Sequence, residues 1–107
     1  MYWVGTSYKD LLVFPNDVKQ EAGYQLHRVQ NGLEPENWKP FPKIGSGVKE
    51  IRISDSGNIY RIMYVAKFAN KLYVLHSFQK KIQKTRPQDI EIAKTRYNAI
   101  MNEEDYE

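Results

Sequence analysis

The sequence predicts a small α+β domain in the order β-α-α-β-β-β-α: an antiparallel twisted sheet with two N-terminal helices and a C-terminal helix. Strand signals at 49–54, 58–66 and 71–78 are separated by short turn sequences, and residues 2–4 form a candidate edge strand. Strands joined by short turns pair as an antiparallel meander. We expect the helices to pack on one face of this sheet.

Apolar residues at helical spacing place the helices. Within 16–30 they recur every three or four positions, and a glycine follows as a stop signal. A shorter helix is predicted over 8–14, and a C-terminal helix begins after a capping signal at Thr85. Residues 33–47 contain three prolines and two glycines, so we expect an irregular loop there.

The length and composition limit the class of protein. A chain of 107 residues is expected to form one domain over 1–107. It contains no cysteine, which excludes disulfides and cysteine-based metal sites, and its two histidines and scattered carboxylates lack metal-ligand spacing. There is no apolar stretch long enough to span a membrane and no signal-peptide pattern. The expectation is therefore a soluble, cytoplasmic protein that needs no cofactor.

Positive charge is concentrated in one part of the chain. Residues 41–86 contain ten Lys and Arg but two Asp and Glu, a net charge of +8, whereas the preceding and following segments carry −1 and −4. The net charge of the whole chain is only +3. A basic block of this kind suits a polyanion such as a nucleic acid.

Strand alternation predicts where two of the arginines lie. In the first strand of the meander, Arg52 lies on the face opposite to the two isoleucines. If the helices cover the isoleucine face, Arg52 lies on the uncovered face, and Arg61 joins it there if the register allows. A planar guanidinium suits phosphate. The alternative is a salt bridge from these arginines to Glu50 or Asp55 on a solvated sheet face.

Three motifs combine in this region: K-E-I-R at 49–52, Y-R at 60–61 and L-H-S-F-Q-K-K-I-Q-K-T at 75–85. Together they resemble the phage-derived, HigB-like branch of the RelE/ParE toxin superfamily. The resemblance implies a compact α+β fold with the predicted element order. It also implies a toxin that cuts messenger RNA, usually in the ribosomal A site, and that a small helix-turn-helix antitoxin of the HigA type neutralises in a toxin–antitoxin complex.

The resemblance also implies roles for individual residues. Arg61 matches the arginine that RelE-like nucleases place on the scissile phosphate, and Lys81, or its neighbour Lys80, matches a second basic residue after the last core strand. Arg52 and Lys49 fall on the strand that supplies lysines in these toxins. The candidate catalytic residues are Arg61, Lys81, Arg52 and His76, and the candidate RNA-binding residues are Lys49, Lys80, Lys84, Arg86 and Lys43.

The implied chemistry requires no metal ion. The RNA 2′-hydroxyl attacks the adjacent phosphorus and leaves a 2′,3′-cyclic phosphate, while Arg and Lys stabilise the developing charge. Glu50, His76 and a lysine with a lowered pKa are candidates for proton transfer. A single histidine within a strand is more often structural. The C-terminal tyrosine of some relatives has no counterpart, because Tyr97 belongs to the apolar stripe of the last helix.

Two other functions are compatible with the same sequence. A ParE-like toxin poisons DNA gyrase by binding and shares the fold of the nucleases, so the fold does not distinguish them. A non-catalytic nucleic-acid-binding module is the other alternative. The predicted Arg and Lys face favours the nuclease, because a gyrase poison needs no phosphate-binding cluster.

Overall fold

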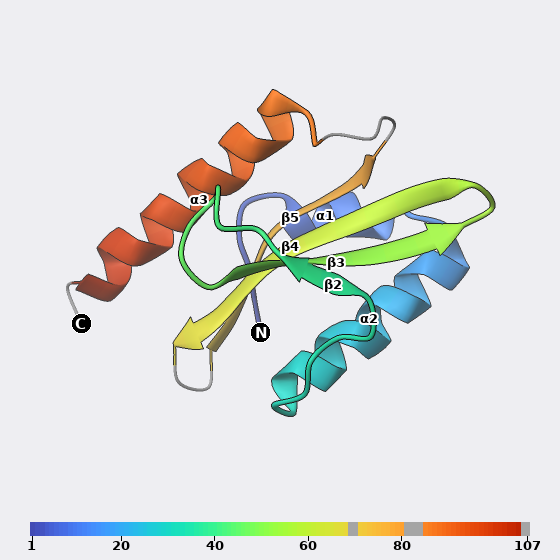
Figure 1. Cartoon of the computed structure of the whole chain (residues 1–107), viewed down its shortest axis with the longest axis horizontal. Coiled ribbons are helices and arrows are strands. Elements are labelled where there is room, and N and C mark those ends of the chain that lie inside the picture. The colour runs from blue at the N-terminus through green and yellow to red at the C-terminus, as the bar shows by residue number, and fades with distance from the viewer. Residues whose placement is uncertain (69–70, 81–84, 106–107) are drawn as a thin grey trace.

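The computed structural model describes residues 1–68, 71–80 and 85–105, which form strands and helices in the predicted α+β class. The elements are β1 (Tyr2–Trp3), α1 (Ser7–Leu12), α2 (Asn16–Gln30), β2 (Trp38–Pro40), β3 (Val48–Asp55), β4 (Asn58–Phe68), β5 (Lys71–Lys80) and α3 (Pro87–Asp105). The strands form one sheet in the order β1-β5-β4-β3-β2 (Figure 1). The fold class and the order of the main elements are confirmed.

The sheet differs from the predicted one in two ways. It is mixed, because β1 pairs parallel with β5 at one edge. At the other edge, β2 pairs antiparallel with β3, although it lies within 33–47, which we expected to be irregular. A proline cannot contribute an N–H to a ladder, but it is tolerated on an edge strand. Pro40 ends β2 at this outer edge, so the prolines of the segment did not exclude a strand.

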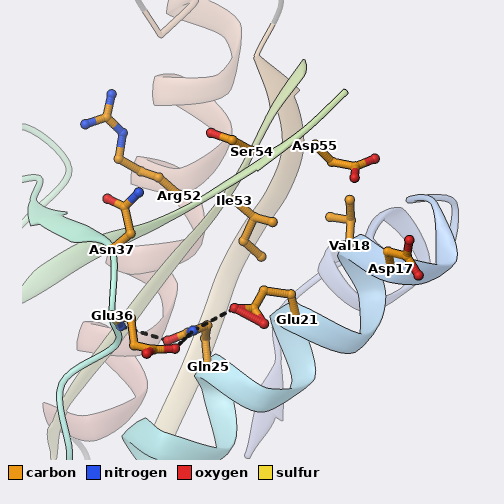
Figure 2. A pocket seen from close by; sticks show the side chains of 10 residues that line it. All are labelled: Asp17, Val18, Glu21, Gln25, Glu36, Asn37, Arg52, Ile53, Ser54 and Asp55. Atoms are coloured by element: carbon orange, nitrogen blue, oxygen red, sulfur yellow. Dashed lines mark hydrogen bonds between the residues drawn. The ribbon is translucent and has the colours of Figure 1, made fainter. Parts of the chain in front are cut away.

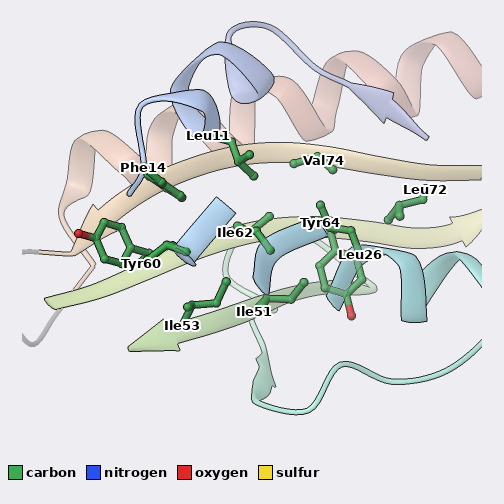
Figure 3. Close-up of a cluster of buried hydrophobic side chains, with 12 residues drawn as sticks. Leu11, Phe14, Leu26, Ile51, Ile53, Tyr60, Ile62, Tyr64, Leu72 and Val74 are labelled. Carbon is green, nitrogen blue, oxygen red and sulfur yellow. The ribbon is translucent and has the colours of Figure 1, made fainter. Parts of the chain in front are cut away.

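Helices cover both faces of the sheet, which corrects the prediction of a single covered face. We call the two sides the α2 face and the α3 face. On the α2 face, a core joins α1 and α2 to the sheet (Figure 3) and consists of Leu11, Phe14, Val18, Ala22, Leu26, Ile51, Ile53, Tyr60, Ile62, Tyr64, Leu72 and Val74. On the α3 face, the buried cluster is Ile44, Val48, Met63, Val65, Tyr73, Leu75, Phe78, Ala93, Tyr97 and Ile100.

The helix α2 has the predicted bounds. Its apolar stripe is buried, and its C-terminus is closed by Gly32, whose φ of +80° suits glycine. Across this glycine, the N–H of Leu33 donates to the carbonyl of Arg28 at 2.9 Å, which satisfies one of the last free carbonyls of the helix. The helix therefore stops where the sequence indicated, and the chain turns back towards β2.

The loop between β2 and β3 is fastened to α3. Ile44 is buried in the core of the α3 face, and the hydroxyl of Tyr97 donates to the carbonyl of Ser46 at 2.9 Å. Gly45 lies against the ring of Tyr97, so closely that an added Cβ would lie 2.3 Å from Cε1. This contact holds the loop over the end of the sheet that α3 covers.

We expect Gly45→Ala to lower the free energy of unfolding by about 1–3 kcal/mol, because the ring of Tyr97 and the loop must move apart. Urea unfolding followed by circular dichroism measures the change. The matched control is Gly23→Ala on the exposed side of α2, where an added Cβ meets no atom within 4 Å. The control should be stabilised by about 0.5–1 kcal/mol. Wild-type stability in Gly45→Ala would contradict the close contact.

Candidate nucleic-acid interface

The register of the sheet brings charged residues from three strands together on the α3 face. Arg52 of β3 lies directly opposite Arg61 of β4, so the register does allow the two arginines to share a face. Glu50 precedes Arg52 on the same face and is a diagonal neighbour of Arg61, while Lys39 of β2 lies opposite Glu50. Side chains at opposite and diagonal positions on one face of a sheet interact. The four residues therefore belong to one site.

Lys80 reaches the same face because β5 contains a bulge. The β4–β5 ladder shifts register at Leu75, which forms an extra residue in β5. Val74, just before the bulge, packs in the core of the α2 face, and strict alternation from there would place Lys80 on the α2 face as well. A bulge shifts this alternation by one residue. It turns three side chains towards α3 and the arginines: His76, Phe78 and Lys80.

Arg61 lies beneath the surface of this site. Its side chain is 1% exposed, and that of Glu50 is fully buried. The Nη1 group of Arg61 donates to Oε1 of Glu50, and Nζ of Lys39 lies 4.0 Å from the same oxygen. Within the described ranges, Nε of Arg61 and Oε2 of Glu50 have no hydrogen-bond partner. The predicted phosphate ligand is therefore ion-paired to Glu50, one of the partners that the alternative interpretation of the sequence named, but the pair is buried rather than on a solvated face.

We call Lys39, Arg52, Arg61, Lys80 and the central Glu50 the cationic cluster. Burial lowers the pKa of Lys80, and the positive charges of Arg61, Lys39 and Arg52 lower it further, against the opposite effect of Glu50. Lys39, Arg52 and Lys80 are partly exposed. In Figure 1, α3 lies towards the end of the sheet away from the β3–β4 turn. Four cations around one carboxylate leave excess positive charge for an anion.

Lys49, a predicted RNA-binding residue, lies on the opposite face from Arg52. Its Nζ contacts the carboxylate of Glu34 at 2.9 Å and lies 4.5 Å from the centre of the Trp38 ring. Strand alternation explains this position, since residues 49 and 52 have opposite parity in β3. The structure therefore does not bring Lys49 into the cationic cluster.

The remaining basic candidates are not members of the cluster or lie outside the described residues. Lys43 is exposed in the loop after β2. Arg86 precedes α3, and its Nε donates to Oδ2 of Asp89 at 3.1 Å. Lys81 and Lys84 fall in a segment that the structure does not describe, so their predicted roles stay predictions. Their described neighbour Lys80 carries the structural argument instead.

His76, a predicted catalytic residue, is buried under α3. It is 5% exposed, its Nε2 lies 2.8 Å from Oδ1 of Asp89, and its ring stacks on Phe78 with centroids 4.8 Å apart. Burial lowers the pKa of His76; Asp89 raises it, Arg96 lowers it and Asp10 raises it by smaller effects. This arrangement supports the structural interpretation of His76, and a catalytic role stays a prediction.

Two charged residues of this region were missed from the sequence. Lys39 is in the proline-rich segment, and its only signal was the alternation of Trp38-Lys39-Pro40-Phe41, which is compatible with a short strand. Asp89 was missed because it lies in the first turn of a helix, where acidic residues are common since they complement the helix dipole. Its burial, at 4% exposure, depends on how α3 docks on β5.

A groove on the α2 face has the opposite electrostatic character (Figure 2). Four carboxylates line it: Asp17, Glu21, Glu36 and Asp55. The buried amide of Gln25 donates to Glu21 at 3.0 Å and to Glu36 at 2.8 Å. Ile53 points into the groove, and Arg52 also lines it, with its guanidinium directed away from the carboxylates. Across the described ranges, no group of three or more His, Asp and Glu side chains is placed to bind a metal ion. An acidic groove repels nucleic acid, so the cationic cluster is the better interface.

A comparison with models of known protein families identifies the family of this chain. The model of the phage-derived Gp49-like family matches residues 9–98, from α1 to the last turns of α3. The chain belongs to the phage-derived Gp49-like family. The match confirms the phage-derived character of the predicted family, and the HigB-like branch stays a prediction. No curated protein matches the sequence of this Gp49-like chain. In the part of the chain that the structure describes, no helix has the length and apolar character to cross a bilayer.

Arg61→Met is expected to lower the free energy of unfolding by about 3–5 kcal/mol, because it leaves Glu50 buried without its partner. The double variant Arg61→Met/Glu50→Leu should recover much of this loss, because its folded state buries no charge at these two positions. Arg52→Met removes a partly exposed arginine from the same face and should cost less than about 1 kcal/mol. Equal losses in the single and double Arg61 variants, measured by urea unfolding, would contradict the buried pair.

Acidification below about pH 6.5 should lower the free energy of unfolding, because the pKa of His76 is lower in the folded protein than in the unfolded chain. The unfolded chain binds a proton in this window that the folded protein excludes, so stability rises with pH. His76→Gln should flatten this dependence, and His27→Gln on the exposed side of α2 should leave it unchanged. An unaltered slope in His76→Gln would overturn the assignment.

Proposed function

We propose that this Gp49-like protein is the toxin of a type II toxin–antitoxin system and an endoribonuclease of the RelE type that cleaves messenger RNA on the ribosome. The observation that supports this proposal is the cationic cluster. Arg52 pairs directly with the buried Arg61, Lys80 is its diagonal neighbour on the same face, and both are partly exposed. Membership of the Gp49-like family, which is grouped with RelE-like toxins, supports the toxin class. A helix-turn-helix antitoxin of the HigA type is the partner that this proposal requires.

The RNA backbone would cross the cluster with its phosphates near the exposed cations. Arg52, Lys39 and Lys80 supply direct contacts, and Arg61 contributes positive charge from beneath them. Guanidinium and ammonium groups form strong hydrogen bonds with phosphate oxygens. Such a preorganised set of donors stabilises the negative charge that builds up on the phosphorus during the reaction.

Cleavage would follow the internal route available to RNA. The 2′-oxygen forms a bond to the adjacent phosphorus as its proton passes to water, and the bond from phosphorus to the 5′-oxygen of the next nucleotide breaks. The products are a 2′,3′-cyclic phosphate and a 5′-hydroxyl, and the leaving oxygen receives a proton. The chain's contribution is to align the attacking oxygen with the leaving oxygen and to stabilise the charged intermediate state.

Among the candidates for proton transfer, Glu50 and Lys80 belong to the cluster and His76 does not. Lys80 is partly exposed and has a lowered pKa, which makes its ammonium a better proton donor. We assign Lys80 to the leaving 5′-oxygen. Glu50 is fully buried against Arg61, and we assign it to holding that guanidinium in place.

Arg52→Ala is expected to weaken growth arrest after induction and to slow messenger RNA cleavage by about tenfold or more, because one phosphate ligand is lost. Arg52 is the appropriate target, since loss of the buried Arg61 also destabilises the fold. Lys9→Ala, which removes an exposed lysine from α1, is the matched control. Growth curves at equal protein levels and mapping of new 5′ ends in messenger RNA are the measurements.

The same experiment distinguishes the alternatives. Codon-linked 5′ ends that depend on Arg52 support the ribosome-dependent nuclease. A DNA-damage response without such ends would favour a gyrase poison. Undiminished growth arrest and unchanged 5′ ends in Arg52→Ala would contradict the role of the cluster.

A further inference from the structure

The bulge in β5 leaves a backbone carbonyl outside the regular ladder. Leu75 is the extra residue, and its side chain is fully buried in the core of the α3 face. Its carbonyl oxygen accepts a hydrogen bond from Nη1 of Arg96 on α3, at 2.8 Å. Buried backbone carbonyls need a donor, and a bulge removes the one that the neighbouring strand would supply. Arg96 therefore satisfies the group that the bulge sets free.

Arg96 is itself held in place from a third element. Its Nη2 donates to Oγ1 of Thr6 at 3.1 Å, in the turn between β1 and α1. The guanidinium lies against Gly5, where an added Cβ would lie 2.6 Å from Nε, and the φ of +56° at this residue favours glycine as well. The rigid fork of one arginine thus joins α3, the β1–α1 turn and the bulge of β5.

We propose that Arg96 is a positioning residue for the cationic cluster: by holding the bulge at Leu75, it keeps Lys80 on the face of Arg52 and Arg61. The side chain of Arg96 acts through the backbone of β5. The RNA-related part of this inference rests on the proposed function, whereas the placement of Lys80 does not depend on it.

The physical reason is the alternation of strand residues. If the bulge at Leu75 loses this donor, the carbonyl of Leu75 is left without its partner on α3, which destabilises the shift of one residue. The end of β5 then loses its fixed alignment with β4, and Lys80 leaves its position beside Arg61. Removing an exposed charge elsewhere on α3 does not alter the bulge and should leave Lys80 in place.

The pKa of the Lys80 ammonium, measured by NMR, tests this placement without RNA. In the wild type it is lowered by burial and by the neighbouring cations. In Arg96→Met it should rise towards the ordinary value of lysine, whereas the matched control Lys94→Met, which loses the same charge from the exposed side of α3, should retain the wild-type value. A folded Arg96→Met with the wild-type pKa at Lys80 would overturn the proposal.

Arg96→Lys decides the question if Arg96→Met does not fold, because it keeps the charge but cannot make both hydrogen bonds of the guanidinium fork. It should shift the pKa of Lys80 in the same direction. A general loss of stability does not move this pKa while the protein remains folded. An unchanged pKa in Arg96→Lys, with the Leu75 carbonyl no longer bonded, would again contradict the proposal.

A short single-stranded RNA provides the functional measurement. Arg96→Met should weaken its binding about fivefold in the otherwise wild-type chain and less than about twofold in a Lys80→Ala background, because the effect of Arg96 passes through Lys80. Equal losses in both backgrounds would show that Arg96 acts on stability alone. If the wild type does not bind the free RNA, the pKa of Lys80 still decides the role of Arg96, while the proposed function is tested separately by the mapping of 5′ ends after induction.

Discussion

The position of one extra residue in β5 governs both the packing and the charge distribution of this protein. Because Leu75 interrupts the alternation, Val74 packs against α1 and α2, while His76 and Lys80 lie on the side of α3. A regular strand would direct a lysine into the apolar core of the α2 face and leave the arginines without it. The bulge therefore allows a continuous core on each side of the sheet and a charged site at the end of one strand.

The charged site is built around an ion pair that the core encloses. Arg61 and Glu50 are shielded from water, so each depends on the other for compensation of its charge. The exposed cations Arg52, Lys39 and Lys80 surround this pair and repel one another, which makes the site receptive to an anion. Stability and function consequently share residues here, and only the exposed members of the cluster test function separately from folding.

The two faces of the sheet divide the surface charge between them. The α2 face carries a groove lined by carboxylates, including Glu21 and Glu36, with a buried glutamine at its centre. The α3 face carries the cationic cluster next to the start of α3. Such a separation orients a polyanion towards one side of the molecule. This separation is what the proposed binding of RNA on the α3 side requires.

The sequence by itself determined the local elements and the face of its own strand on which Arg52 lies, because alternate residues of a strand point to opposite faces. That Arg61 shares this face depended on the register of β3 and β4. The sequence also identified α2 and the apolar stripe of α3 from their spacing. Only the tertiary structure decided that Arg61 is buried against Glu50, that Lys39 joins them from an edge strand, and that helices cover both faces. These features depend on contacts between distant segments and on a bulge whose carbonyl is satisfied by α3, and no local pattern encodes such contacts.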